Sequence, residues 1–439
     1  VPFRPSAVLT LTAGEQGPLV SDPAFAPAGR LESHGKTFVK LTKDGASSWW
    51  TQTPALSGAL TLHEVQYTAT LGDGRRMVNG APESTNNKLR PVGNIESIRG
   101  KSGPDAATGS VGPLRFLASI GDPASRINLW KKERFDDGKD KVTVYFPTLV
   151  EGNRVLRPGL KFKVEGSATE KINFASLMLA LFLGTAALPH ILIRYYTVSS
   201  PAAARKSTIV AIAAIGFFYI LTLFMGLGAM TNGVVNLLDD NMSAPLLARS
   251  FGVLLFAVIS AIAFATVLGT VSGLIVAASG AVAHDFLDRF LGLGYDDRQK
   301  VRAGKIAAFS VGLIAIVLGI VFKGMNVSFL VGWAFAVAAS ANLPAIIMLL
   351  FWKKTTAAGI VASIATGTLS ALGIILLSPE MFERYGLDKS SAPMPFGNPA
   401  IISVPVSFLA LVLVSLATQK SAAPPAVRSG RSPEVSGRP

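Results

Sequence analysis

The chain contains no cysteine, only four histidines and few charged residues. Without cysteine there is neither a disulfide framework nor a thiolate metal site. Lys, Arg, Asp and Glu make up 15% of the 439 residues, whereas soluble domains usually carry about a quarter. No catalytic constellation and no dinucleotide-binding fingerprint follows from the sequence. We therefore predict that the protein is not an enzyme and that it uses no organic cofactor.

What the chain does contain is apolar sequence, which makes up half of its residues. Runs of about 20 apolar residues without a charged side chain are typical of membrane-spanning helices. Seven such runs follow one another, at 172–193, 207–232, 250–283, 306–322, 327–352, 355–378 and 399–418. A soluble protein with seven such helices in succession would have almost no polar surface. We predict a mainly α, polytopic membrane protein, located in the plasma membrane with the lipid bilayer around it.

The loops between these runs carry basic residues unevenly. Alternate loops from Arg194 onward, together with the C-terminal tail, hold fourteen Lys and Arg residues, and the opposite loops hold four. Because basic loops stay on the cytoplasmic side, we predict a cytoplasmic C-terminus and an extracellular location for residues 1–171.

Residues 1–171 differ from the rest, since they carry 23 Lys and Arg and 17 Asp and Glu. The segments "ALTLHEVQYTATL", "KVTVYFPTLV" and "GLKFKVEG" are rich in β-branched and aromatic residues and predict strands. "GDG" at 72–74 and "NG" at 79–80 predict hairpin turns. We expect a β-rich extracellular domain, and its predicted location argues against nucleic acid as a partner.

Translocation of such a domain needs a preceding membrane segment. Residues 1–30 contain no apolar stretch of signal-peptide length, and the chain does not begin with Met. We expect that a membrane-embedded N-terminal half precedes this chain and that residues 1–171 are a loop insertion of a longer protein.

The first apolar run, "LMLALFLGTAALPHILIRYYTV", is interrupted at Gly184, Thr185, Pro189 and His190. Glycine and proline loosen the hydrogen-bond ladder of a helix, and in a membrane such a break persists only inside protein or beside a water-filled cavity. The second half-helix favours an anion at its N-terminus, and freed carbonyls favour a cation. Discontinuous helices of this kind mark substrate sites in secondary transporters. The alternative is a proline kink in an ordinary helix.

Several stretches resemble one known family. "GTAALPHILIRYYTV", "ARKS" at 204–207 and "GFFYILTLFMGLGAM" at 216–230 resemble the sodium:solute symporters, with the greatest likeness to the bacterial cation/acetate symporters. "AFATVLGTVSGLIVAASGAVAHDFLDRF" at 263–290 and "GWAFAVAASANLPAIIMLLFW" at 332–352 are similar to their later helices. The long extracellular insert resembles the actinobacterial version. The "PHIL-R" core is also similar to the proline transporters of the same family.

The resemblance implies a five-plus-five inverted-repeat fold of the leucine-transporter type. Residues 172–352 would form the second repeat with five transmembrane helices, and 353–420 would hold two peripheral helices. Residues 421–439 are rich in Pro and Ser and predict a disordered cytoplasmic tail. The first repeat, with its own broken helix, is the part that we expect to be missing and to be needed for function.

A sodium site is also implied by the resemblance. Counted back from Asp285, the ligands of the family fall on Thr266, Gly269 and Thr270. Their spacing places them on one helical face, and oxygen ligands suit a hard cation. Many relatives have a serine where Gly269 stands. The alternative for the threonines is a hydrogen bond back to the i−4 carbonyl of their own helix.

For the substrate, the resemblance places Thr185 where the proline transporters have a gating aromatic residue. His190 at the end of the break is interpreted as a carboxylate ligand, a proton relay or a bridge between two helices. Ser340 and Asn342, beside Pro344, are candidates for lining the pathway or for holding helices together. The predicted substrate-binding residues are Gly184, Thr185, Pro189, His190, Ser340 and Asn342.

We predict a secondary active transporter that couples Na⁺ or H⁺ flow to the uptake of acetate or a related short monocarboxylate by alternating access. A symporter-like solute sensor is the alternative from another class, but the short tail carries no signalling domain. An inactive truncated fragment of the symporter is a third possibility.

Overall fold

The computed structural model describes residue 3 and residues 8–14, 17–33, 35–54, 60–157, 159–162, 164–192, 195 and 197–419. Arg194 and the predicted disordered tail at 421–439 lie outside the described residues. The chain divides into two compact units, which are described separately. The first comprises residues 1–160 and 202–326, and the second comprises 161–201 and 327–439.

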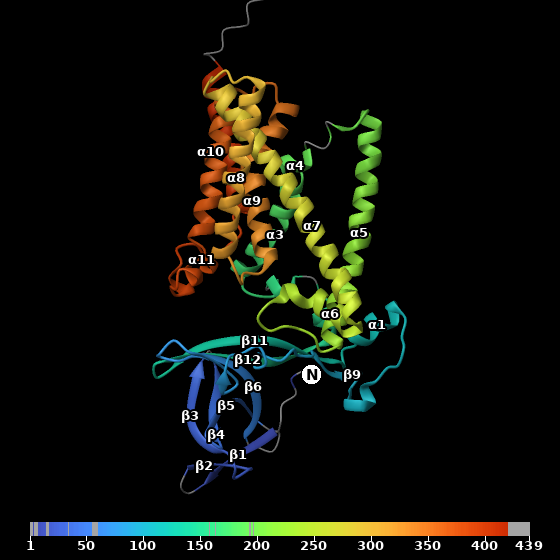
Figure 1. Cartoon of the computed structure of the whole chain (residues 1–439), viewed down its shortest axis with the longest axis vertical. Helices are drawn as coiled ribbons and strands as arrows, with labels where there is room; N and C mark the ends of the chain where they lie inside the picture. The colour runs from blue at the N-terminus through green and yellow to red at the C-terminus, as the bar shows by residue number, and fades with distance from the viewer. Residues whose placement is uncertain are drawn as a thin grey trace, which may run out of the picture. The chain divides into compact units, whose positions relative to one another are not determined.

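The first unit begins with a twelve-stranded antiparallel sheet, whose main path runs β10-β9-β11-β12-β6-β5-β4-β3 (Figure 1). β1 pairs with β2 and β6, and β7 pairs with β6 and β8. The strands are β1 Val8–Gly14, β2 Gly17–Val20, β3 Ala26–Ser33, β4 Lys36–Lys43, β5 Ala46–Pro54, β6 Leu60–Thr70, β7 Arg76–Val78, β8 Ala81–Pro82, β9 Ile95–Ile98, β10 Lys101–Ser102, β11 Arg126–Asp137 and β12 Asp140–Glu151. The strands predicted in "ALTLHEVQYTATL" and "KVTVYFPTLV" are β6 and β12.

Both faces of the sheet carry a buried apolar cluster at the central strands β4, β5 and β6. Successive side chains of a strand point to opposite faces, so the neighbours Trp49 and Trp50 of β5 enter different apolar clusters. Trp49 packs with Phe38 and Phe146, while Trp50 packs with Leu41 and other residues of β1, β4 and β6. The sheet domain therefore has two cores of its own.

The turn predicted at Asn79 and Gly80 joins β7 to β8, and both residues have the positive φ angles of a type I′ turn, 47° and 84°. By contrast, the strand predicted for "GLKFKVEG" is wrong. Leu160–Phe162 is a short 3₁₀ turn. Phe162 is half-buried and packs on Phe174 and Phe329 in the second unit, so its apolar side chain contacts helices and not the sheet.

The helices of the first unit are α1 Pro113–Ile120, α2 Gly152–Val155, α5 Pro201–Thr231, α6 Ser243–Phe251, α7 Val253–Gly280, a π-helical segment at Ala281–Phe290, and α8 Asp297–Val321. The sheet domain contacts the C-terminal end of α5. Val92 and Val235 form an antiparallel bridge, and Ile120, Ile127 and Leu227 share one buried cluster.

The second unit is helical. It consists of α3 Ala168–Thr185, α4 Pro189–Leu192, α9 Val327–Phe351, α10 Ala357–Leu376, α11 Pro379–Arg384 and α12 Ala400–Thr418. Among the described residues, seven helical segments of the two units are long and apolar enough to cross a membrane: Ala168–Leu192, Pro201–Thr231, Val253–Phe290, Asp297–Val321, Val327–Phe351, Ala357–Leu376 and Ala400–Thr418. Each overlaps one of the seven predicted apolar runs, so the prediction of seven long apolar helices is confirmed.

Small residues let the helices of the second unit approach closely. Ser363 of α10 and Ser407 of α12 are fully buried, with their hydroxyl oxygens 2.9 Å apart. A Cβ atom at Gly359 or Gly367 of α10 would collide with α12 side chains, those of Ser415 and Ser407 respectively. Association of apolar helices through small residues and interhelical hydrogen bonds is typical of membrane proteins.

Candidate substrate and cation sites

The break predicted in the first apolar run is present in the structure. α3 begins with a capping box, in which the Ser167 hydroxyl accepts from the Glu170 backbone N–H and the Glu170 carboxylate accepts from that of Ser167. It ends at Thr185, where the backbone N–H of Ala187 donates back to the Gly184 carbonyl at 2.9 Å. α4 starts at Pro189, which has no N–H to donate. Residues 186–188 thus separate two helical segments.

Gly184 holds the end of α3 directly against α9. A Cβ atom built on Gly184 would lie 2.5 Å from the Phe335 carbonyl oxygen and 2.8 Å from its Cα. Ala180, Ala336 and Ala339, all fully buried, extend this contact between the two helices. Because the nearest atoms belong to the α9 backbone, they cannot move aside as a flexible side chain would. Glycine at 184 is therefore a requirement of the packing.

Asn342 of α9 stabilises the break itself. Its Nδ2 donates to the Ala187 carbonyl at 3.1 Å, and Ala187 is fully buried. A buried carbonyl outside a helix needs a donor, and Asn342 supplies one from a helix 155 residues away in the chain. Two contacts with α9 therefore stabilise the break, one at Gly184 and one at Ala187.

Ser340 has a different environment. It is fully buried, and its hydroxyl contacts the Ala336 carbonyl at 2.7 Å and the Ser403 hydroxyl of α12 at 2.6 Å. Pro344 lacks the N–H that would otherwise bond the Ser340 carbonyl, and this carbonyl lies against Gly367 of α10. In this structure Ser340 joins three helices.

The other predicted substrate residues lie at the open side of the break. Thr185 is exposed and its hydroxyl donates to the Leu181 carbonyl at 2.6 Å. Pro189 is exposed and His190 is half-buried on α4. The structure therefore places Gly184, Thr185, Pro189, His190 and Asn342 around one break, and Ser340 in the adjoining helix interface.

The predicted cation residues lie on α7, in the first unit. The Thr266 hydroxyl donates to the Ile262 carbonyl at 2.8 Å, and the Thr270 hydroxyl donates to the Thr266 carbonyl at 3.0 Å. Both threonines are exposed, and a Cβ atom at Gly269 would meet no atom within 4 Å. The hydroxyls are thus back-bonded to their own helix, and their oxygens retain lone pairs for a further donor or cation.

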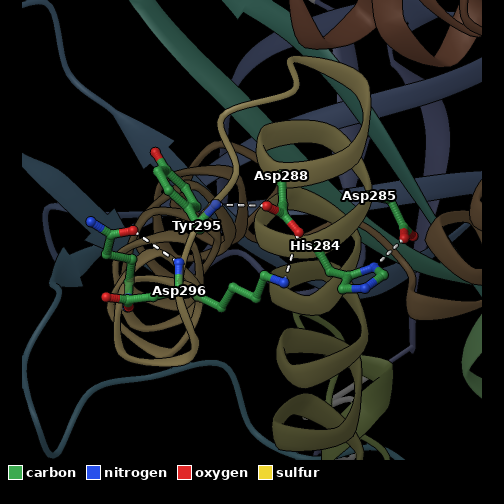
Figure 2. Close-up of polar contacts among 7 residues, drawn as sticks. His284, Asp285, Asp288, Tyr295 and Asp296 are labelled. Carbon is green, nitrogen blue, oxygen red and sulfur yellow. Dashed lines mark hydrogen bonds and ion pairs between the residues drawn. The ribbon is translucent and has the colours of Figure 1, made fainter.

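α7 continues into the π-helical segment at Ala281–Phe290, and the turn after it is rich in polar contacts (Figure 2). The Asp288 carboxylate accepts from the Tyr295 backbone N–H at 2.8 Å and pairs with the Lys300 ammonium at 2.9 Å. Nδ1 of His284 lies 2.8 Å from the Asp285 carboxylate. Asp296 and Gln299 form a capping box at the start of α8. These contacts fix the connection between α7 and α8.

A family model provides the decisive comparison, since residues 151–367 match the sodium:solute symporter family. This match covers just under half of the chain. The match extends from the end of the sheet domain into α10, so it includes the broken helix, α7 and α9. The residues around the break and on α7 therefore lie within the part of the chain that matches this family.

Two curated relatives are similar to this chain. It is 45% identical over 270 residues to the "Monocarboxylic acid transporter" of Corynebacterium glutamicum (strain ATCC 13032), covering 58% of this chain and 48% of the relative. It is 43% identical over 267 residues to the "Uncharacterized symporter YwcA" of Bacillus subtilis (strain 168), covering 59% and 51%. The chain spans about half the length of these curated relatives. No solved structure matches it.

Sequence reasoning missed several residues that shape the second unit. Phe335 meets Gly184, and Ser403 meets Ser340. Asn398 donates from its backbone and its side chain to the Asn173 side-chain oxygen, at 2.9 and 2.8 Å. The four-residue spacing of small residues on α10 and α12 is a sequence signal for their interface, whereas nothing in the sequence links Asn173 to Asn398.

Proposed function

We propose that this chain is part of a secondary active transporter that couples the inward flow of Na⁺ or H⁺ to the uptake of acetate or a related short monocarboxylate. The match to the sodium:solute symporter family supports symport of a solute, and a relative named as a monocarboxylic acid transporter supports the substrate class. The observation that carries the proposal is the break between α3 and α4, built into the fold by the Gly184–Phe335 contact and the Asn342–Ala187 hydrogen bond.

The break forms one side of the carboxylate site in this proposal. It presents a hydroxyl, an imidazole and backbone groups at Thr185, His190 and residues 186–188. Because Thr185, Ala186 and Pro189 are exposed, a carboxylate there would be only partly desolvated by the residues on this side. We therefore expect further contacts from segments outside residues 172–352, as a five-plus-five inverted-repeat fold would supply from its first repeat.

The cation proposal rests on α7. Thr266, Gly269 and Thr270 lie on one face, where two hydroxyl oxygens and the local carbonyls would present hard oxygen ligands. In the same proposal residues 1–171 are extracellular, 172–352 form the second repeat, 353–420 hold two peripheral helices and the C-terminus is cytoplasmic. The fourteen-to-four distribution of basic residues supports this orientation.

Uptake of labelled acetate tests the function. The full-length protein, expressed in cells that lack their own acetate uptake, should accumulate labelled acetate against its gradient, and unlabelled propionate and pyruvate should compete. Replacing Na⁺ by a larger cation at constant pH, and changing pH at constant Na⁺, identifies the coupling ion. Accumulation that is insensitive to both ions would contradict coupled transport, and absent competition by any monocarboxylate would contradict the substrate class.

A further inference from the structure

The N-terminal part of α8 carries a basic face that the proposed transport function does not use. Four Lys and Arg residues occur within its first nine positions. One of them, Lys300, is neutralised by Asp288 at 2.9 Å. Arg298, Arg302 and Lys305 are exposed, and none of these three side chains forms an ion pair or a hydrogen bond with any described residue. Three cationic groups thus remain without a counter-charge in this part of the chain.

These three residues lie on one face of the helix. Their spacing of four and then three residues confines them to an arc of about 60° at 3.6 residues per turn. Lys300 lies on the opposite face, with the buried Ala307 and with Gly304, which approaches Ala283. The basic face, which we define as Arg298, Arg302 and Lys305, therefore points away from the packed side of α8.

The same outward arc continues along α8 as apolar surface. Four large side chains occupy it beyond the basic face, and all are exposed: Phe309 75%, Leu313 53%, Ile316 63% and Ile320 69%. In a helix that spans a bilayer, such a stripe contacts acyl chains. Because each residue rises about 1.5 Å along the axis, the basic face lies about one to three turns before the acyl-contacting stripe, at the depth of the phospholipid headgroups.

Aromatic residues flank this level on the neighbouring segment. Phe286 and Phe290 of the π-helical segment stack with ring centroids 5.7 Å apart and are 51% and 77% exposed. The Asp288–Lys300 ion pair ties this segment to α8 (Figure 2). Phe rings carry no polar group and suit the acyl region next to the headgroups, while long basic side chains at this level extend their charged ends towards the headgroups.

We propose that the basic face of α8 binds the headgroup of an anionic phospholipid in the adjacent leaflet. Guanidinium groups form paired hydrogen bonds with phosphate oxygens, and three uncompensated cations favour a headgroup with net negative charge over a zwitterionic one. Continuity with the acyl-contacting stripe identifies a lipid as the source of the phosphate, since only a lipid uses both parts of the surface. The proposal requires that α8 spans the bilayer and is independent of the transported solute and the coupling ion.

Lipid association in bilayer nanodiscs tests the proposal. The full-length protein is reconstituted in phosphatidylcholine, and association of fluorescently labelled phosphatidylglycerol is compared with that of labelled phosphatidylcholine. We expect a preference for phosphatidylglycerol that weakens with added salt. Because each basic residue near an anionic surface changes association by about fivefold, Arg302→Gln should reduce the preference about fivefold, and Arg298→Gln with Arg302→Gln and Lys305→Gln roughly 100-fold.

A control variant with the same loss of charge separates local binding from net charge. Lys88, Lys101 and Arg115 are exposed residues of the first unit outside its long helices, and their triple replacement by Gln should leave the lipid preference unchanged. If both triple variants lose the preference for phosphatidylglycerol to the same extent, net charge explains the preference and the proposed site is refuted. An unchanged preference after replacement of the basic face would also overturn it, as expected if another protein segment covers that face. Displacement of the labelled lipid by millimolar inorganic phosphate would show that the basic face binds free phosphate, and would overturn the proposal that the bound phosphate belongs to a lipid.

If the triple variant does not fold, the proposal is tested by the Arg302→Gln variant and by the salt dependence of lipid association with the wild-type protein. A wild-type preference that is insensitive to salt, together with an Arg302→Gln protein that matches wild type, would refute the proposal. Labelled acetate uptake is not the readout, so failure of the transport proposal is recognised separately.

Discussion

Substitution of Gly184 is the most direct test of how the break is held. In Gly184→Ala the new Cβ atom would lie 2.5 Å from the Phe335 carbonyl oxygen, 2.7 Å from its Cβ and 2.8 Å from its Cα, where ordinary contact begins at 3.4 Å. All three atoms belong to one residue of α9. The end of α3 must therefore move away from α9 by roughly 1 Å for these contacts to relax.

The magnitude follows from two opposing effects. Overpacking of a well-packed contact costs about 1–3 kcal/mol, while replacing a helical glycine by alanine gains about 0.5–1 kcal/mol. We expect Gly184→Ala to lose about 1–2 kcal/mol of stability in balance. Gly184→Leu adds three more carbons at the same contact and should lose more. Movement of α3 also lengthens the Asn342–Ala187 hydrogen bond, so uptake should fall as well.

Gly226→Ala is the matched control, because a Cβ atom at Gly226 of α5 would meet nothing within 4 Å. The assay is the thermal unfolding midpoint of the purified full-length protein in detergent, with labelled acetate uptake in cells as the second readout. Gly226→Ala should retain uptake and unfold at an equal or higher temperature than wild type. If Gly184→Ala behaves like Gly226→Ala in both assays, the close contact between α3 and α9 is refuted.

Three further predictions concern the cation, the sheet domain and the topology. Thr270→Ala should raise the cation concentration for half-maximal uptake about 5- to 150-fold, as for a lost interaction of about 1–3 kcal/mol, and Thr270→Ser should stay near wild type. An unchanged cation dependence in the alanine variant would leave the hydrogen bond to the Thr266 carbonyl as the role of the Thr270 hydroxyl. Burial raises the pKa of Tyr67 to about 12, and its hydroxyl donates to the Ser47 carbonyl at 2.6 Å. The contribution of Tyr67 to stability is therefore complete below pH 10 and lost between pH 10 and 12. Tyr67→Phe should flatten the alkaline unfolding profile measured by tryptophan fluorescence, and a profile identical to wild type would contradict this role. Single cysteines at Gly74 and Ser429 should differ on intact cells, with an impermeant reagent labelling only the former, and the reverse pattern would invert the proposed orientation.

Much of the secondary structure was predictable because its signals are local. The apolar runs predict seven helices, and the Asn79–Gly80 pair predicts a turn because both positions need positive φ angles. The prediction failed for "GLKFKVEG", whose alternating apolar residues suit a strand but whose Phe162 packs against Phe174 and Phe329. Periodicity alone does not say which neighbour will cover an apolar side chain.

The candidate site was predictable only in part. Gly184 and Pro189 mark the break because their effects on a helix are intrinsic. Asn342 and Ser340 were both predicted to be substrate-binding residues, yet they have different partners in the structure. Asn342 donates to the Ala187 carbonyl, and the Ser340 hydroxyl contacts the Ser403 hydroxyl. Side chains that are two positions apart on a helix point in different directions. Which neighbouring helix each of them contacts depends on how distant parts of the chain pack together.

By itself, the sequence of this protein determined where its helices lie, where the first apolar helix breaks and which symporter family its residues resemble. The tertiary structure decided that α9 closes on that break, through the missing side chain of Gly184 and the amide of Asn342. It also decided which basic residues of α8 stay uncompensated, since Asp288 neutralises Lys300 alone. The physical reason is range: helix formation and interruption depend on residues within a few turns, whereas steric contact and ion pairing depend on which surfaces the folded chain brings together.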